Sequence, residues 1–242
     1  MDHEAPRVYA LHGGGTTPAL WNPLRRVVPD LPIVAPDLNR IARDIGEAPS
    51  YEQVVDALLE QAPPGPLVLL GATMGARFAV SVGARLGDRL RAMLLLMPLD
   101  ADEDASFLAK FAGLRRFLVE GFSESYRETV IPVMLHRWGP RFAEASQELR
   151  QILTEGAGAT AAALSHASSV LDEPAAIQLR RIAASVEVLF GAADPVFEPS
   201  LANSWRRLPA VRSVEILPEV SHQIALEVPQ RIAADLRRLL AR

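Results

Sequence analysis

Short apolar runs alternate with stretches of helical periodicity along most of this chain. The runs at 8–12, 33–38, 67–72, 93–97, 186–190 and 214–217 each predict a β-strand. Helical spacing follows at 51–61, 75–86 and 229–241, and Ser50 with Gln53 forms a capping-box pattern before the first of these helices. Alternating strands and helices are typical of a mostly parallel sheet covered by helices on both faces. The pattern therefore predicts an α/β fold.

One long segment interrupts this alternation. Residues 99–180 are helical in pattern throughout, with Phe107, Phe111 and Leu114 among apolar positions spaced three and four apart. We therefore expect a helical insertion within a single domain whose core comprises residues 1–98 and 181–242. Because the insertion follows a strand, it is expected to lie over the carboxyl ends of the sheet, where open α/β proteins bind ligands.

Composition and charge exclude several classes of function. The chain contains no cysteine, which excludes a thiol nucleophile, a disulfide framework and a cysteine-based zinc site. The net charge is only -4 and the basic residues are dispersed, so nucleic-acid binding is not expected. The N-terminus is polar and lacks a signal-peptide or membrane-span pattern, which leads us to expect a cytoplasmic protein without membrane association. A small molecule is the expected partner, and the oligomeric state is left open.

The segment from Gly71 to Gly75 has the pattern Gly-x-nucleophile-x-Gly directly after an apolar run. Such a pattern forms a sharp strand-to-helix turn in which the glycines leave room for close packing. Its central residue is Thr73, where serine is usual. The turn forces that residue toward positive φ, which for a β-branched side chain costs on the order of 1–3 kcal/mol. Thr73 is therefore either retained for a purpose or left over from a decayed site.

Three further groups follow predicted strands in the order that this turn leads one to expect. Gly13–Gly15 ends the first strand, Asp194 lies on a loop after a later strand, and His222 follows the last one. Nucleophile, acid and histidine in this chain order are what a catalytic triad on such a sheet requires. Simpler interpretations remain: Asp194 can cap a turn before a proline, His222 can cap a helix, and the glycines can form a phosphate loop.

These motifs together resemble the α/β-hydrolase superfamily, over essentially the whole chain. His12-Gly13 followed by Trp21 is similar to the His-Gly and downstream Trp of that family, and Ser221-His222 with Glu227-Val228-Pro229 is similar to its terminal histidine and Glu-x-Pro stretch. The resemblance implies the α/β-hydrolase fold and a cap formed by the insertion. The chain departs from the family at Thr73 and at residues 37–43, where many relatives carry a Gly-His-Gly turn, so we expect a reshaped loop there.

The resemblance also implies roles for further residues. The backbone N–H groups of Gly14 and Met74 would form the oxyanion hole, and Gly13 and Trp21 would lie near the substrate. In the insertion, His136 and Trp138 are candidates to line a pocket, although aromatic residues at helical spacing usually pack inward. No cofactor motif or metal-ligand cluster is visible, and the acidic run at 100–104 is interpreted as a solvated helix start.

Three functions are compatible with these residues. The first is hydrolysis of an ester, thioester or lactone of a small apolar molecule, with Thr73 as nucleophile, His222 as base and Asp194 orienting the base. The second is a non-hydrolytic lyase or isomerase in which His222 acts directly on the substrate. The third is a catalytically inactive ligand-binding protein. The added methyl group of threonine, which crowds a tetrahedral intermediate, keeps the second and third open.

Overall fold

Six parallel strands form the sheet in this computed structural model, which describes residues 5–102, 151–152, 167, 173–194 and 197–241. The strands are β1 (Arg7–Leu11), β2 (Ile33–Val34), β3 (Leu67–Ala72), β4 (Leu90–Leu96), β5 (Ser185–Gly191) and β6 (Val211–Leu217). Their order is β2-β1-β3-β4-β5-β6, and every neighbouring pair is parallel. The carboxyl ends of all the strands therefore meet at one edge of the sheet, as a shared site requires.

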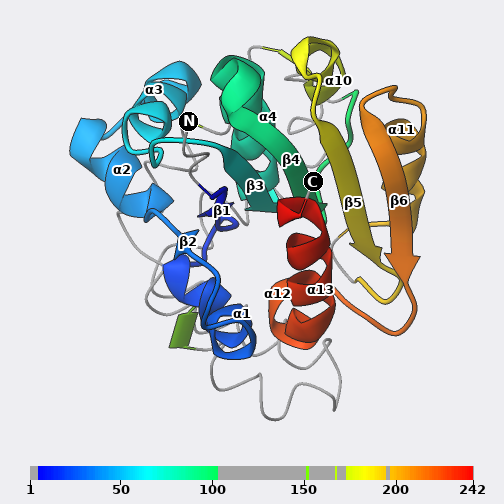
Figure 1. The fold of residues 1–242 in the computed structure, drawn as a ribbon. Coiled ribbons are helices and arrows are strands. Elements are labelled where there is room, and N and C mark those ends of the chain that lie inside the picture. Colours follow the sequence, from blue (N-terminus) through cyan, green and yellow to red (C-terminus); the bar gives the residue numbers. More distant parts are fainter. Residues whose placement is uncertain (1–4, 103–150, 153–166, 168–172, 195–196, 242) are drawn as a thin grey trace, which may run out of the picture.

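Helices cover both faces of the sheet, as Figure 1 shows. One face carries α1 (Asn22–Val27) and α13 (Pro229–Leu240), with the short α12 (Ile224–Glu227) before α13. The other face carries α2 (Leu38–Ile45), α3 (Tyr51–Glu60), α4 (Met74–Leu86), α10 (Ala175–Gln178) and α11 (Ala202–Arg206). Short 3-10 turns lie at η1 (Pro18–Trp21), η2 (Gly87–Arg89), η4 (Leu179–Arg181) and η5 (Pro199–Leu201).

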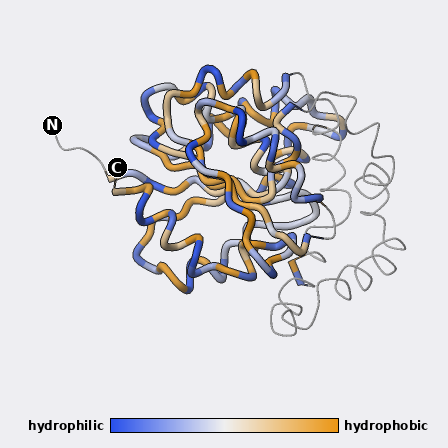
Figure 2. The backbone as a smooth tube through the Cα atoms, turned by 90° about the vertical axis from the view of Figure 1, so that its right-hand side faces the viewer, coloured by the Kyte–Doolittle hydropathy of each residue, from blue (hydrophilic) through white to orange (hydrophobic). Residues whose placement is uncertain are grey.

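The hydrophobic core lies along the central strands. All six residues of β3 are buried, and the apolar strands gather in the middle of the molecule in Figure 2, with hydrophilic segments mostly outside. A strand that is covered on both faces has no solvent side, so its sequence is a continuous apolar run and does not alternate with polar residues. This is why the strand before the Gly-x-Thr-x-Gly segment was recognisable from sequence.

The predicted α/β fold is confirmed, with one error among the elements outside the insertion. The helix at 51–61 is α3, and its capping box joins Ser50 and Gln53 in both directions. A strand does begin at Ile33, but the prediction of 33–38 was too long, because β2 ends at Val34 and α2 begins at Leu38. The carboxylate of Asp37 accepts hydrogen bonds from the first turn of α2 and caps it. The segment expected as a reshaped loop at 37–43 is therefore the start of a helix.

Most of the expected insertion lies outside the described residues. Within 99–180 the structure describes 99–102, 151–152, 167 and 173–180, and α10 in the last of these pieces is helical as expected. His136 and Trp138 lie outside the described residues, so their part in a pocket remains a prediction. The division of the chain into a core and a cap likewise remains a prediction.

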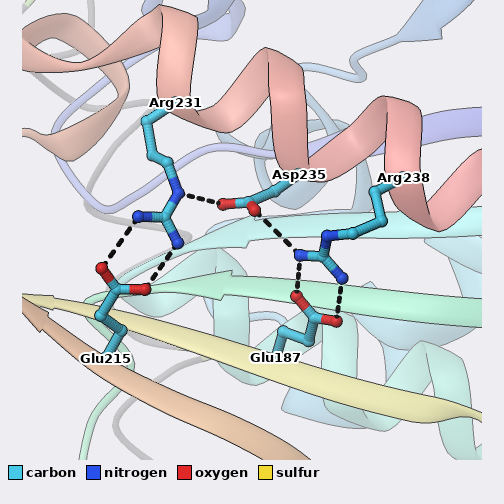
Figure 3. A network of polar contacts seen from close by, with 5 residues as sticks. All are labelled: Glu187, Glu215, Arg231, Asp235 and Arg238. Carbon is cyan, nitrogen blue, oxygen red and sulfur yellow. Dashed lines mark hydrogen bonds and ion pairs between the residues drawn. The ribbon is translucent and has the colours of Figure 1, made fainter.

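An ion-pair network fixes α13 to the outer strands (Figure 3). Arg231 forms paired hydrogen bonds of 2.8 and 2.6 Å to Glu215 of β6, which lowers the pKa of that carboxyl. Arg238 forms two bonds of 2.6 Å to Glu187 of β5. Asp235, on the same helix, accepts from both arginines. Because only the short α12 and Val228 separate α13 from His222 and Gln223, this network also restrains the chain leaving the candidate site.

Replacing Arg238 with methionine is expected to lower the free energy of unfolding by about 2 kcal/mol, because Glu187 would lose two strong bonds while its side chain stays buried. The neighbouring Arg237→Met variant is the matched control, since Arg237 pairs with Asp30 at an exposed site where such bridges contribute little. Urea unfolding of both variants measures the difference. Equal stabilities of the two variants would contradict a structural role for the network.

Candidate active site

The Gly-x-Thr-x-Gly segment forms the sharp turn that its sequence predicts. Thr73 has φ 49° and ψ -111°, and its N–H donates to the carbonyl of Leu96 at 2.8 Å. A Cβ on Gly71 would lie within 3.0 Å of the backbone of Ala76, and one on Gly75 would lie as close to the end of β1. Both glycines are therefore required by close packing. The turn holds Thr73 between β3 and α4 in a backbone conformation that β-branched residues rarely adopt.

The Thr73 hydroxyl points toward the loop after β1. A Cβ on Gly13 would collide with Thr73 Oγ1, so this oxygen lies directly against the Gly13 backbone. The hydroxyl does not cap α4, because it accepts no hydrogen bond from the first turn of that helix. Thr73 is partly exposed, although Ala72 before it and Met74 after it are buried. The turn thus presents a hydroxyl at the carboxyl edge of the sheet.

A hydrogen bond joins His222 to Asp194. Nδ1 of His222 lies 2.8 Å from Oδ2 of Asp194, whose side chain is fully buried, while the imidazole is 10% exposed. The other carboxylate oxygen accepts the N–H of Phe197 at 3.0 Å, and the Phe197 ring contacts the imidazole edge-on. A carboxylate only accepts hydrogen bonds, so the proton lies on Nδ1 and Nε2 is left as the acceptor. This is the tautomer that a general base requires.

Backbone contacts join the loop of His222 to the loop of Asp194. The N–H of Ala193 donates to the carbonyl of Val220 at 2.9 Å. Gly191 packs so closely on Val220 and Ser221 that a Cβ there would lie within 3.0 Å of their carbonyl oxygens. Asp194 and His222 therefore lie on loops that are held together by backbone contacts.

A second carboxylate, that of Glu227, holds the His222 loop through Ser221. Glu227 accepts the Ser221 N–H at 2.8 Å and the Ser221 hydroxyl at 2.7 Å. Burial raises the pKa of Glu227, and the Ser221 donors oppose that rise. The Glu-x-Pro stretch recognised in the sequence thus has a physical role, which is to hold the backbone next to His222.

The structure places the other predicted site residues that it describes, and their roles remain predictions. Gly14 is partly exposed between the buried Gly13 and Gly15, whereas Met74 is the buried first residue of α4. Trp21 is fully buried in the core, and its indole N–H has no partner within the part of the chain that the structure describes. Contact of Trp21 with a ligand therefore remains a prediction.

Two neighbours of the site were not singled out from the sequence. Phe197 packs against His222, and Thr16 reaches the backbone of Gly13 through its hydroxyl. No sequence motif marks this phenylalanine or this threonine, so the sequence gives no reason to assign either of them to a site and not to the core or a turn.

Among the described residues no group of three or more His, Cys, Asp or Glu side chains is placed to hold a metal ion. Nor do the described helices include one that is long and apolar enough to cross a bilayer.

Comparison with known proteins agrees with this architecture. The model of the alpha/beta hydrolase family matches residues 8–235, and the chain belongs to that family. Lipase LipV of Mycobacterium tuberculosis is 32% identical over 96 residues, a match that spans 38% of this chain and 37% of the relative. The chain thus matches well under half of that relative's length.

Solved structures resemble the chain over nearly its whole length. A thermophilic esterase from Thermogutta terrifontis has a TM-score of 0.77 at 20% identity, covering 98% of this chain and 89% of that one. The enol-lactonase from Burkholderia xenovorans has a TM-score of 0.72 at 18% identity, covering 99% and 92%. At these identities the likeness establishes the fold, and the chemistry has to be argued from the site.

Proposed function

We propose that this protein hydrolyses an ester, thioester or lactone of a small apolar molecule. Thr73 is the nucleophile, His222 the general base and Asp194 the residue that orients the base. The observation that carries the proposal is the 2.8 Å bond between His222 Nδ1 and the buried Asp194 carboxylate. A solvated surface histidine has no need of a fully buried carboxylate, whereas a general base depends on one to fix its tautomer.

The proposed reaction has two stages, acylation of Thr73 and hydrolysis of the acyl-threonine. Thr73 Oγ1 attacks the carbonyl carbon while its proton passes to Nε2 of His222. The carbonyl oxygen becomes an oxyanion that accepts hydrogen bonds from the N–H groups of Gly14 and Met74. Collapse of this intermediate expels the alcohol or thiol, which takes the proton from His222. Water, deprotonated by His222, then attacks the acyl-threonine and releases the acid, with Thr73 regaining its proton.

Two features support a catalytic role for Thr73. The hydroxyl lies against Gly13 and does not cap α4, so no structural use of it is apparent in its own helix. Asp194 and His222 are hydrogen-bonded to each other and lie on loops that backbone hydrogen bonds hold together. Family membership and the likeness to an esterase and an enol-lactonase agree with hydrolysis of a carboxylic ester. The methyl group of Thr73 is expected to make acylation slower than with serine, because it restricts the side-chain rotamer.

A pair of variants at position 73 tests the nucleophile. Thr73→Ser is expected to retain or raise the turnover of short-chain activated esters, because it keeps the hydroxyl and removes the crowding methyl group. Thr73→Ala is expected to lose at least about 10³-fold in kcat/KM, since no covalent intermediate can form. Steady-state kinetics and labelling with a serine-directed phosphonate, read by mass spectrometry of the intact protein, measure both effects.

The same pair separates the alternatives. Slow labelling of the wild type at Thr73 supports the covalent mechanism. Substantial activity of Thr73→Ala together with loss in His222→Ala would contradict it and indicate a lyase or isomerase that uses His222 directly. Saturable ligand binding without turnover by the wild type, Thr73→Ser or Thr73→Ala would indicate a binding protein.

A further inference from the structure

The carbonyl oxygen of Gly13 receives an unusual number of hydrogen bonds. The Thr16 hydroxyl donates to it at 2.8 Å and the Thr16 N–H at 3.3 Å. Nδ1 of His12 lies 2.9 Å from the same oxygen. Nε2 of His12 accepts the N–H of Leu38 at 3.0 Å, so in the neutral ring Nδ1 carries the proton and is the third donor. Three donors thus fix the direction of one peptide group.

Fixing that carbonyl also fixes the neighbouring N–H. The Gly13 carbonyl and the Gly14 N–H belong to the same planar trans peptide, in which C=O and N–H point in opposite directions. With the carbonyl held inward by Thr16 and His12, the Gly14 N–H is directed away from them. Gly14 is partly exposed, and its N–H donates to no other group in the described part of the chain. The Thr73 hydroxyl lies against the adjacent Gly13 backbone.

Thr16 is itself held by the first turn of α2. The side-chain amide of Asn39, in the first turn of α2, donates to the Thr16 carbonyl at 2.8 Å. Asn39 and Thr16 are both almost fully buried. The segment that departs from the family pattern therefore contacts the loop after β1 through two bonds, one from the Leu38 backbone and one from Asn39.

We propose that Thr16 is a positioning residue for the oxyanion hole: with Asn39 behind it, Thr16 holds the Gly13–Gly14 peptide so that the Gly14 N–H faces the developing oxyanion. This inference rests on the proposed hydrolytic function. A buried threonine with a merely structural role would affect folding, whereas Thr16 in this role acts on the transition state. Its loss should therefore lower kcat and leave KM nearly unchanged, because the oxyanion forms only in the transition state.

The test compares three variants of the full chain. Thr16→Val keeps the shape and removes the hydroxyl, and is expected to lower kcat for an activated ester by about ten- to a hundredfold, since a small misplacement of a reacting group has effects of this size. Thr16→Ser restores the hydroxyl and should restore kcat. Thr17→Val is the matched control, because the Thr17 hydroxyl accepts from Ala19 and does not contact Gly13; its kcat should equal that of the wild type.

Two further measurements keep the test decisive. Affinity for a trifluoromethyl ketone, which forms a tetrahedral adduct, should weaken in Thr16→Val by the same factor as kcat/KM. If that variant does not fold, Asn39→Ala provides the second route and should lower kcat in the same direction. Unchanged kcat in a folded Thr16→Val protein with an active wild type would overturn the role of Thr16 alone. A wild type without turnover or labelling would overturn both this role and the proposed hydrolysis.

Discussion

Replacing His222 with alanine is expected to lower kcat/KM for ester hydrolysis by about 10³- to 10⁴-fold, because the Thr73 proton then has no acceptor. Asp194→Asn should have an effect of similar size for a different reason. An amide NH₂ facing Nδ1 would move the imidazole proton to Nε2, which leaves the ring unable to act as a base toward Thr73. Steady-state kinetics of both variants on the substrate used for the wild type measure the loss.

The two variants control each other. Asp194→Asn keeps the ring and its packing against Phe197, whereas His222→Ala removes both. If only His222→Ala were inactive, the imidazole would be needed for packing or substrate contact. Its orientation by Asp194 would then not be needed for activity. Near-wild-type activity of His222→Ala, with an unchanged unfolding transition, would show that His222 is not the base. Both variants must be shown to be folded before their activities are compared, because the loops of Asp194 and His222 are joined by backbone hydrogen bonds.

Gly75→Ala is expected to destabilise the fold by about 3 kcal/mol or more, which places it among the large single-substitution effects. The new Cβ would lie within 3.0 Å of the carbonyl oxygens of Leu11 and His12, both of which belong to the backbone and have little freedom to move. Alanine is otherwise the better helix former by about 1 kcal/mol, so a loss of stability has to come from this collision. Urea unfolding measures the effect.

Gly87→Ala is the matched control for that substitution. Gly87 has φ 56° and ψ -130°, with open space around its Cβ position, so alanine there meets only backbone strain of about 1–3 kcal/mol. Gly75 has no positive φ, and its requirement is for space alone. A Gly75→Ala protein as stable as the wild type would mean that β1 and α4 can separate without loss of the fold, contrary to the packing described above.

Some elements of the fold follow from the local sequence, and others depend on distant contacts. The Gly71–Gly75 turn was predictable because strand, glycines and helix are contiguous and each has a local physical reason. The segment after Val34 was not, because its apolar residues continued the strand pattern while Asp37 capped a helix. The periodicity of 99–180 predicted helices, but helical periodicity alone does not say whether His136 or Trp138 lies at a site.

Local periodicity and short motifs were enough to specify the alternating strands and helices, the strained turn at Thr73 and the chain order of Thr73, Asp194 and His222. They were enough because each depends on neighbours within a few residues. Packing of the whole chain decided that Asp194 reaches Nδ1 of His222, that Glu227 supports Ser221, and that Asn39 supports Thr16. The Asp194 and Asn39 contacts join residues 28 and 23 positions apart, and their geometry exists only once parallel strands have brought their carboxyl ends to one edge of the sheet.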